Sequence, residues 1–110
     1  MHITQSDFEQ IDMRAGTIVD AQPFEKARNP SYKLWIDFGE LGIKKSSAQI
    51  TALYKPEELV GRQVIAVVNF PPKQIANFIS ECLVLGVYNE QNDVVLLQPD
   101  RQVQNGGKIG

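Results

Sequence analysis

The segment from Lys33 to Phe38 constrains the fold most strongly, because apolar and polar residues alternate along it in the order Lys-Leu-Trp-Ile-Asp-Phe. Successive side chains of a β-strand point to opposite faces of a sheet. Leu34, Ile36 and Phe38 are therefore expected to face a core, and Trp35 the other side. Trp35 then needs a cover, either from the same chain or from a second copy, since aromatic residues are enriched between subunits.

Other short segments along the chain also have strand character. Strands are expected over Met13–Ala21, Ile43–Ile50, Gln63–Asn69, Cys82–Tyr88 and Val94–Leu97. Gly16, within the first of these, predicts a bulge or a close approach of two backbones. The segment Ile43–Ile50 is not strongly apolar on either face, which is typical of a sheet edge or a working surface.

Two short helices are expected, one before the first strand and one in the middle of the chain. Ser6 and Glu9 have the spacing of a capping box, and Tyr54–Leu59 has Pro56 in its first turn, followed by Gly61 as a stop. Five or six short strands with one small mid-chain helix predict a mainly all-β fold, a five-stranded OB barrel. The 110 residues are expected to form one domain, 1–110.

The inventory of reactive side chains is small. The only histidine is His2, and the only cysteine, Cys82, stands among apolar residues and is expected to be a small buried hydrophobe. No His-based triad, Cys–His pair or zinc ligand set can be assembled from these residues. We therefore expect a protein that is not an enzyme and uses no metal and no cofactor. The lack of a secretory leader and of ~20 consecutive apolar residues predicts a cytoplasmic protein without membrane insertion.

Positive charge is concentrated in the middle third of the chain. Residues 26–55 hold six lysines and arginines against two acids, although the whole chain has a net charge of −2. Such an island can steer a phosphate backbone or an acidic partner. The alternative is a scattered, solvated lysine face, and the net acidic balance is unusual for a protein whose main work is nucleic-acid binding.

The segment from Asn69 to Cys82, expected to be a loop between two buried strands, is unusually apolar. It is stiffened by two prolines and carries one cation, Lys73. Connectors are normally polar, so this composition predicts a surface that contacts a partner. The alternative is that the apolar side chains fold back and plug the end of the barrel. The residues expected to contact a polypeptide are Phe70, Pro71, Pro72, Ile75 and Phe78.

Several motifs resemble those of the EMAP-II-like tRNA-binding domain family, in the same order over nearly the whole chain. These motifs are Asp12–Val19, Lys33–Gly39, Pro56–Gly61, Val67–Phe70 and Ser80-Glu81. Within the family, three segments resemble the CsaA branch of bacterial export-related chaperones: Ile43–Thr51, Ala66–Pro72 and Val95–Asp100. The resemblance implies an OB fold, a homodimer, and binding of unfolded preproteins and of the translocation motor SecA.

The chain departs from the tRNA-binding pattern at two places. Ala76-Asn77 stands where tRNA-binding relatives tend to have Arg-Gly, and Cys82-Leu83 stands where they have Gly-Met. The arginine that would bind phosphate is therefore absent. Phe78 and Ile79 stand nearby, and these side chains contact apolar groups instead. The substitutions favour a polypeptide over a nucleic acid.

Two functions are predicted from these observations. The first is a CsaA-like molecular chaperone that binds unfolded preproteins and assists protein export. The alternative is a tRNA-binding module that acts as a tRNA escort, with Tyr32 or Trp35 available for base stacking. Its expected nucleic-acid contacts are Lys33, Lys44, Lys45, Ser46, Lys73 and Ser80. A homodimer is expected to form through Phe8, Ile11 and Trp35.

Overall fold

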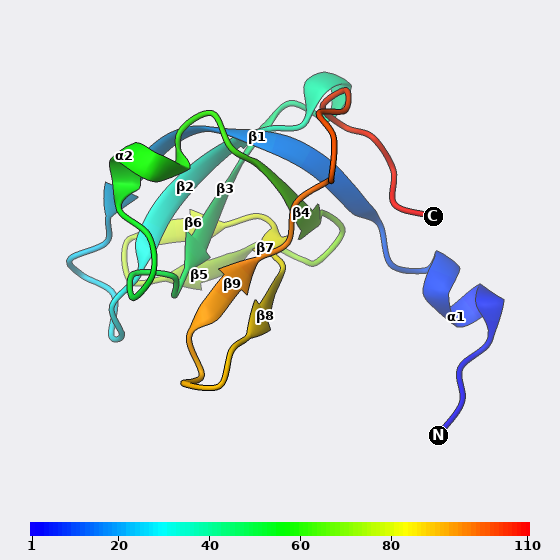
Figure 1. The fold of residues 1–110 in the computed structure, drawn as a ribbon, viewed down its shortest axis with the longest axis horizontal. Coiled ribbons are helices and arrows are strands. Elements are labelled where there is room, and N and C mark those ends of the chain that lie inside the picture. Colours follow the sequence, from blue (N-terminus) through cyan, green and yellow to red (C-terminus); the bar gives the residue numbers. More distant parts are fainter.

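A five-stranded antiparallel sheet curls into a nearly closed barrel in the computed structural model, which describes residues 1–110 (Figure 1). In order across the sheet, the strands are β3 (Ile43–Ala48), β2 (Tyr32–Asp37), β1 (Met13–Pro23), β4 (Gln63–Val67) and β7 (Leu83–Val84). Near β7, the Glu81 N–H donates to the Lys45 carbonyl of β3 at 2.7 Å, which brings the two edge strands together. The predicted OB-type barrel is confirmed.

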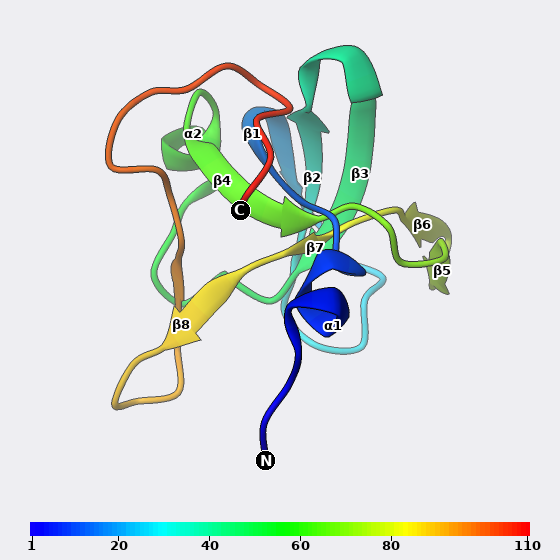
Figure 2. The same ribbon diagram turned by 90° about the vertical axis from the view of Figure 1, so that its right-hand side faces the viewer.

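Two hairpins and three short helical segments complete the fold. They are β5 (Lys73–Ile75) with β6 (Phe78–Ser80), β8 (Gly86–Tyr88) with β9 (Val94–Leu96), α1 (Gln5–Glu9), α2 (Pro56–Leu59) and the 3-10 turn η1 (Gly39–Leu41). Figure 2 shows β5–β6 on one side of the barrel and β8 on the opposite side. No helix in the structure combines the length and the apolar character needed to cross a membrane.

The core forms where the sequence pattern places it. Leu34, Ile36 and Phe38 have no exposed surface, as the alternation along β2 predicts. Ile18 from β1 and Leu59 from α2 are equally buried and belong, with Leu34, Ile36 and Phe38, to the same cluster. The opposite face of β2 therefore points outward and carries Lys33, Trp35 and Asp37.

Gly16 is a point of close approach inside the barrel. A Cβ atom at this position would lie 2.7 Å from side-chain atoms of both Ile36 and Phe38, which is too close for any larger residue. The bulge of β1 lies elsewhere, because the pairing register with β2 shifts between Ile18 and Asp20. The close approach at Gly16 is therefore to side chains and not to a second backbone, and the extra residue that bends β1 is Val19, three positions later.

Helix α1 begins earlier than predicted. The capping box is formed by Thr4 and Asp7: the Asp7 N–H donates to Thr4 Oγ1 at 3.1 Å, and the Thr4 N–H donates to Asp7 Oδ2 at 3.0 Å. The prediction that Ser6 and Glu9 form this box is wrong, because the same spacing occurs two residues upstream and the helix already ends at Glu9. Helix α2 is confirmed, with Pro56 in its first turn.

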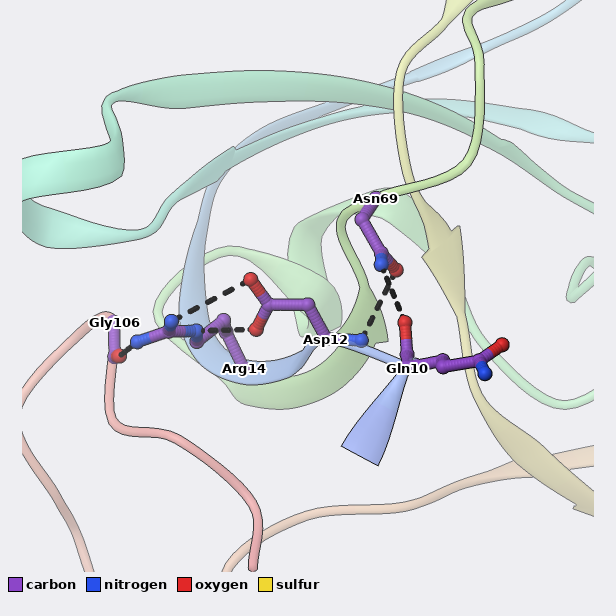
Figure 3. Close-up of polar contacts among 5 residues, drawn as sticks. All are labelled: Gln10, Asp12, Arg14, Asn69 and Gly106. Atoms are coloured by element: carbon purple, nitrogen blue, oxygen red, sulfur yellow. Dashed lines mark hydrogen bonds and ion pairs between the residues drawn. The ribbon is translucent and has the colours of Figure 1, made fainter. Parts of the chain in front are cut away.

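A polar network joins the N-terminal helix, the barrel and the C-terminal segment (Figure 3). Asn69 accepts a hydrogen bond from the Asp12 N–H at 3.0 Å and donates one to the Gln10 carbonyl at 2.8 Å. The Arg14 guanidinium pairs with Asp12 at 2.6 Å and donates to the Gly106 carbonyl at 3.1 Å. Asn69 also begins the connector to β5, so this network holds one end of the candidate site in place.

Candidate functional site

The connector after β4, expected to be a loop, is a β-hairpin. β5 and β6 pair antiparallel with Ile75 opposite Phe78, and Ala76 in the turn has a φ of +53°. The turn falls at Ala76-Asn77, and Ala76 adopts the positive φ that a tight hairpin turn needs at its first position. The prediction of a loop is therefore wrong. Ile75 and Phe78 lie directly opposite each other across the two strands, so their side chains share one face of the hairpin.

Phe78 is buried beneath this hairpin. Only 7% of it is exposed, and its ring packs edge-on against Phe24 at 5.4 Å and Trp35 at 5.8 Å between ring centroids. The ammonium groups of Lys33 and Lys45 lie over the same ring at 5.5 and 5.3 Å. Phe78 thus plugs the outer face of β2 and β3. It also covers part of Trp35 from within the chain, and Phe78 itself is too buried to stack on a base.

A groove of about 550 Å³ opens beside the hairpin. Four of the five residues predicted to contact a polypeptide line it, namely Phe70, Pro71, Pro72 and Ile75; Phe78 does not. Phe70 is 55% exposed, which is unusual for a large aromatic side chain. The remaining lining residues are Ser47, Gln49, Lys73, Ser80, Glu81, Cys82 and Leu83. The groove therefore combines an apolar, proline-stiffened wall with a polar strand edge.

The polar wall belongs to the edge of β3. The Lys45 N–H donates to Glu81 Oε1 at 3.0 Å, and the Ser47 N–H donates to Ser80 Oγ at 3.3 Å. These bonds hold β6 and the residues after it against β3. Sequence reasoning missed Ser47, Gln49 and Glu81 as site residues, although the weakly apolar faces of the segment Ile43–Ile50 did indicate an edge.

Cys82 is a buried thiol at the side of the groove, as predicted. Burial raises its pKa to about 12, and the negative charge of the neighbouring Glu81 adds to the rise. The thiolate is the reactive form of cysteine, so a raised pKa keeps the side chain unreactive at neutral pH. Its Sγ lies 3.6 Å from the Lys45 carbonyl. Cys82 therefore packs as a small hydrophobe.

The residues predicted for nucleic-acid binding do not form one surface. Lys73 and Ser80 line the groove, and Lys33 and Lys45 flank the Phe78 ring. Lys44 and Ser46 lie on the alternate face of β3. Ser46 is almost fully buried and its hydroxyl donates to the Cys82 carbonyl at 2.9 Å. A nucleic acid could reach the first two pairs more easily than the third.

The three residues predicted for a dimer interface are also separated. Ile11 is exposed and Phe8 is half-buried near α1, which stands clear of the barrel (Figure 1). Trp35 lies under the β5–β6 hairpin instead. A larger exposed apolar set lies on and around the β8–β9 hairpin, and sequence reasoning treated it as ordinary strand: Leu83, Val87, Tyr88, Val95 and Leu97. The run Val94–Leu97 consists only of apolar residues, and this pattern could have indicated the exposed set. A strand with one buried face needs an apolar residue only at every second position.

Known proteins resemble the chain over its full length. A family model described as "Putative tRNA binding domain" matches residues 13–108. The crystal structure of the chaperone CsaA from Bacillus anthracis is 55% identical, with a TM-score of 0.94 and 100% of both chains covered. The chain belongs to the tRNA-binding domain family, in its CsaA branch. The CsaA chaperone protein of Picrophilus torridus is 54% identical, with a TM-score of 0.93 over 99% of this chain and 100% of that one.

Members of this family also occur inside much larger proteins. The methionine–tRNA ligase of Bdellovibrio bacteriovorus is 35% identical over 104 residues, which is 94% of this chain. This CsaA-type chain spans only 15% of the length of that ligase. The ligase's similarity therefore concerns one small part of that enzyme.

Proposed function

We propose that this protein is a CsaA-like molecular chaperone that binds unfolded preproteins in the cytoplasm and assists their export. The observation that carries the proposal is the groove beside β5–β6, where Phe70, Pro71, Pro72 and Ile75 present apolar surface to solvent. The match to CsaA chaperone structures over the whole chain supports the same function. The protein acts as a binding module and not as an enzyme.

The groove suits an unfolded chain for physical reasons. Full burial of an apolar side chain contributes roughly 1.5–3 kcal/mol, and an unfolded preprotein offers such side chains in every segment. Pro71 and Pro72 restrict the backbone conformation of the groove wall before a client binds. Less conformational entropy is therefore lost on binding. Apolar contacts of this kind are weak and tolerate different sequences, so one groove binds many different clients.

A tRNA-binding function is the second candidate. The family match and the similarity to a methionine–tRNA ligase support it. Lys73 and Ser80 line the groove and offer a cation and a hydroxyl to a phosphate. Two observations weigh against it: Ala76 replaces the arginine of the tRNA-binding relatives, and Trp35 and Phe78 cover each other.

We also propose a homodimer and an interaction with SecA. Val87 and Val95 of β8–β9, which share one face of that hairpin, together with Leu97 and with Ile11 beside α1, are exposed apolar residues that a second copy of the chain would bury. Phe8 and Trp35, predicted for the same interface, are half-buried in the single chain and stay predictions. SecA binding is what membership of the CsaA branch suggests.

The decisive experiment is a parallel titration of the protein with tRNA and with an unfolded, signal-bearing preprotein at two salt concentrations. The chaperone function predicts tight preprotein binding that changes little with salt. Phe70→Ala combined with Ile75→Ala should weaken it by about 1–3 kcal/mol. Ile79→Ala is the matched control, because Ile79 is an exposed apolar residue of the same hairpin outside the groove.

The tRNA function predicts a different set of results. tRNA should bind more tightly than the preprotein, and Lys73→Ala should flatten the salt dependence by about one unit of slope per lost phosphate contact. Lys44→Ala combined with Lys45→Ala should flatten it further. The order of the two functions would be reversed by two results together. The lysine variants would bind tRNA with the flattened salt dependence predicted, and the folded variant with Phe70→Ala and Ile75→Ala would bind the preprotein as the original protein does.

A further inference from the structure

The edge of β3 carries main-chain groups that have no partner. The Ser47 N–H donates to Ser80 Oγ, which places it on the side of β3 that faces away from β2. The N–H and C=O of one residue in an antiparallel strand point to the same side, so the Ser47 carbonyl also faces outward. Neither this carbonyl nor the Gln49 N–H makes a hydrogen bond within the protein. Unpaired edge groups of this kind are a template for another extended chain.

Two cavities meet along this edge. The groove of about 550 Å³ and a second cavity of about 320 Å³ both include Ser47, Gln49 and Leu83 in their walls. Tyr88 and Val94, from the β8–β9 hairpin, form part of the second cavity. An extended segment beside β3 would point successive side chains to opposite faces, and each face meets one of the cavities.

We propose that the groove receives its client by β-strand addition to the free edge of β3. The client's main chain pairs with the Ser47 carbonyl and the Gln49 N–H, and its successive side chains enter the two cavities in turn. This inference rests on the proposed function and specifies how the client is held. Main-chain hydrogen bonds are independent of sequence, and the two cavities select for apolar side chains.

The charges of the two cavities favour an uncharged client segment. Lys73 and Glu81 are the only lysine, arginine, aspartate or glutamate side chains in the combined walls, so their charges balance. The Glu81 carboxylate is engaged with the Lys45 N–H as well. A polyphosphate backbone would bring several negative charges to a site with one free cation, whereas a neutral, apolar polypeptide matches it.

The first test removes the Gln49 donor. Gln49→Pro deletes the N–H, and Gln49→Ala is its matched control because it keeps the N–H and removes only the side chain. Strand addition predicts that Gln49→Pro weakens capture of the unfolded preprotein roughly fivefold to tenfold, the effect of one hydrogen bond. Gln49→Ala reports what the Gln49 side chain contributes as a wall of both cavities, so the fivefold to tenfold loss is measured relative to Gln49→Ala. Equal binding by both variants would overturn strand addition, while leaving the chaperone function in place.

The second test leaves the protein unchanged, so it decides the question even if Gln49→Pro fails to fold. The probe is a fluorescein-labelled, end-capped nonapeptide in which valine and serine alternate, with one amide at a time N-methylated. Strand addition predicts that affinity falls at every second central position, because alternate N–H groups face β3. Uniform loss, or none, at all positions overturns it. Failure of the original protein to capture any unfolded preprotein would instead overturn the proposed function itself.

Discussion

The two hairpins of this protein are of similar length, but one is packed against the barrel and the other is largely exposed to solvent. β5–β6 lies against the barrel and buries Phe78, whereas β8–β9 projects from it and leaves Val87 56% and Tyr88 72% exposed (Figures 1 and 2). Both have apolar residues in strand spacing. Spacing determines which side chains share a face, but it does not determine whether that face meets the rest of the protein.

Hydrogen bonds hold the base of each hairpin, and the two hairpins differ in the side chains that they pack inward. Two bonds hold the end of β6 against β3: Ser47 N–H to Ser80 Oγ, and Glu81 N–H to the Lys45 carbonyl. β9 is tied only at its own end, through Leu96 N–H to the Tyr54 hydroxyl at 3.0 Å and Leu97 N–H to the Leu85 carbonyl at 3.1 Å. Both hairpins are thus bonded at the end of their second strand, and they differ in packing: β6 buries the Phe78 ring, whereas β9 buries Leu96 and leaves Val95 exposed.

The largest expected effect follows from removing the buried plug of β5–β6. Phe78→Ala should lower the free energy of unfolding by about 3–5 kcal/mol, because it opens a cavity between Phe24 and Trp35. Thermal melting measures the loss, and Trp35 fluorescence should shift to longer wavelength as the ring meets water. Ile79→Ala, on the exposed face of the same hairpin, should change stability by less than about 1 kcal/mol. Similar losses for both would mean that the hairpin does not pack as described.

The next effect concerns β8–β9 and the proposed homodimer. Val87→Asp should shift the protein from dimer to monomer by weakening association about 2–4 kcal/mol, since a charge replaces an apolar contact. Sedimentation equilibrium across a concentration series gives the result. Ile79→Asp places the same charge on the other hairpin and should leave the dimer intact. A wild-type protein that is monomeric at micromolar concentration would contradict the interface.

A smaller effect comes from Cys82, which directly follows the docked hairpin. Its thiol has an ordinary pKa of 9.0, and burial raises this to about 12 in the folded protein. The unfolded chain therefore loses its thiol proton first, so stability present below pH 9 should decline as the pH rises from 9 toward 12. Cys82→Ala should show a shallower decline in urea unfolding over this range.

Thiol labelling gives a second measure of the same residue. Dithionitrobenzoate should react slowly with Cys82 in the folded protein at pH 8 and faster in Phe78→Ala, where the hairpin opens more often. Fast labelling of the original protein would show that β5–β6 is not held against β3.

The smallest effect tests the lysines over the Phe78 ring. Lys33→Gln and Lys45→Gln should each cost about 0.5–1 kcal/mol, the usual size of a cation–π contact at a partly exposed site. Lys26→Gln is the control, because Lys26 is exposed and lies over no ring. Urea unfolding compares the three variants. Equal stabilities would show that the lysines merely lie near the ring and add nothing to the docking of β5–β6.

Much of the barrel could be predicted from the sequence because its information is local. The alternation from Lys33 to Phe38 places Leu34, Ile36 and Phe38 in the core, and the structure confirms it. Pro56 and Gly61 bound α2 through backbone conformations that each residue prefers by itself. The groove-lining residues Phe70 to Pro72 and Ile75 were also found, since apolar side chains in a connector are informative without any structure.

Long-range contacts decided the rest. Phe78 and Phe70 are the same residue type in the same connector, yet one is buried against Phe24 and Trp35 and the other faces solvent. The sequence by itself determined the first four barrel strands, the core face of β2 and the presence of an apolar connector, because neighbouring residues suffice for those. Only the tertiary structure decided which connector residues plug the barrel, which line the groove, and where β3 keeps an unpaired edge. These outcomes depend on contacts between residues 33 to 45 positions apart, which no local pattern encodes.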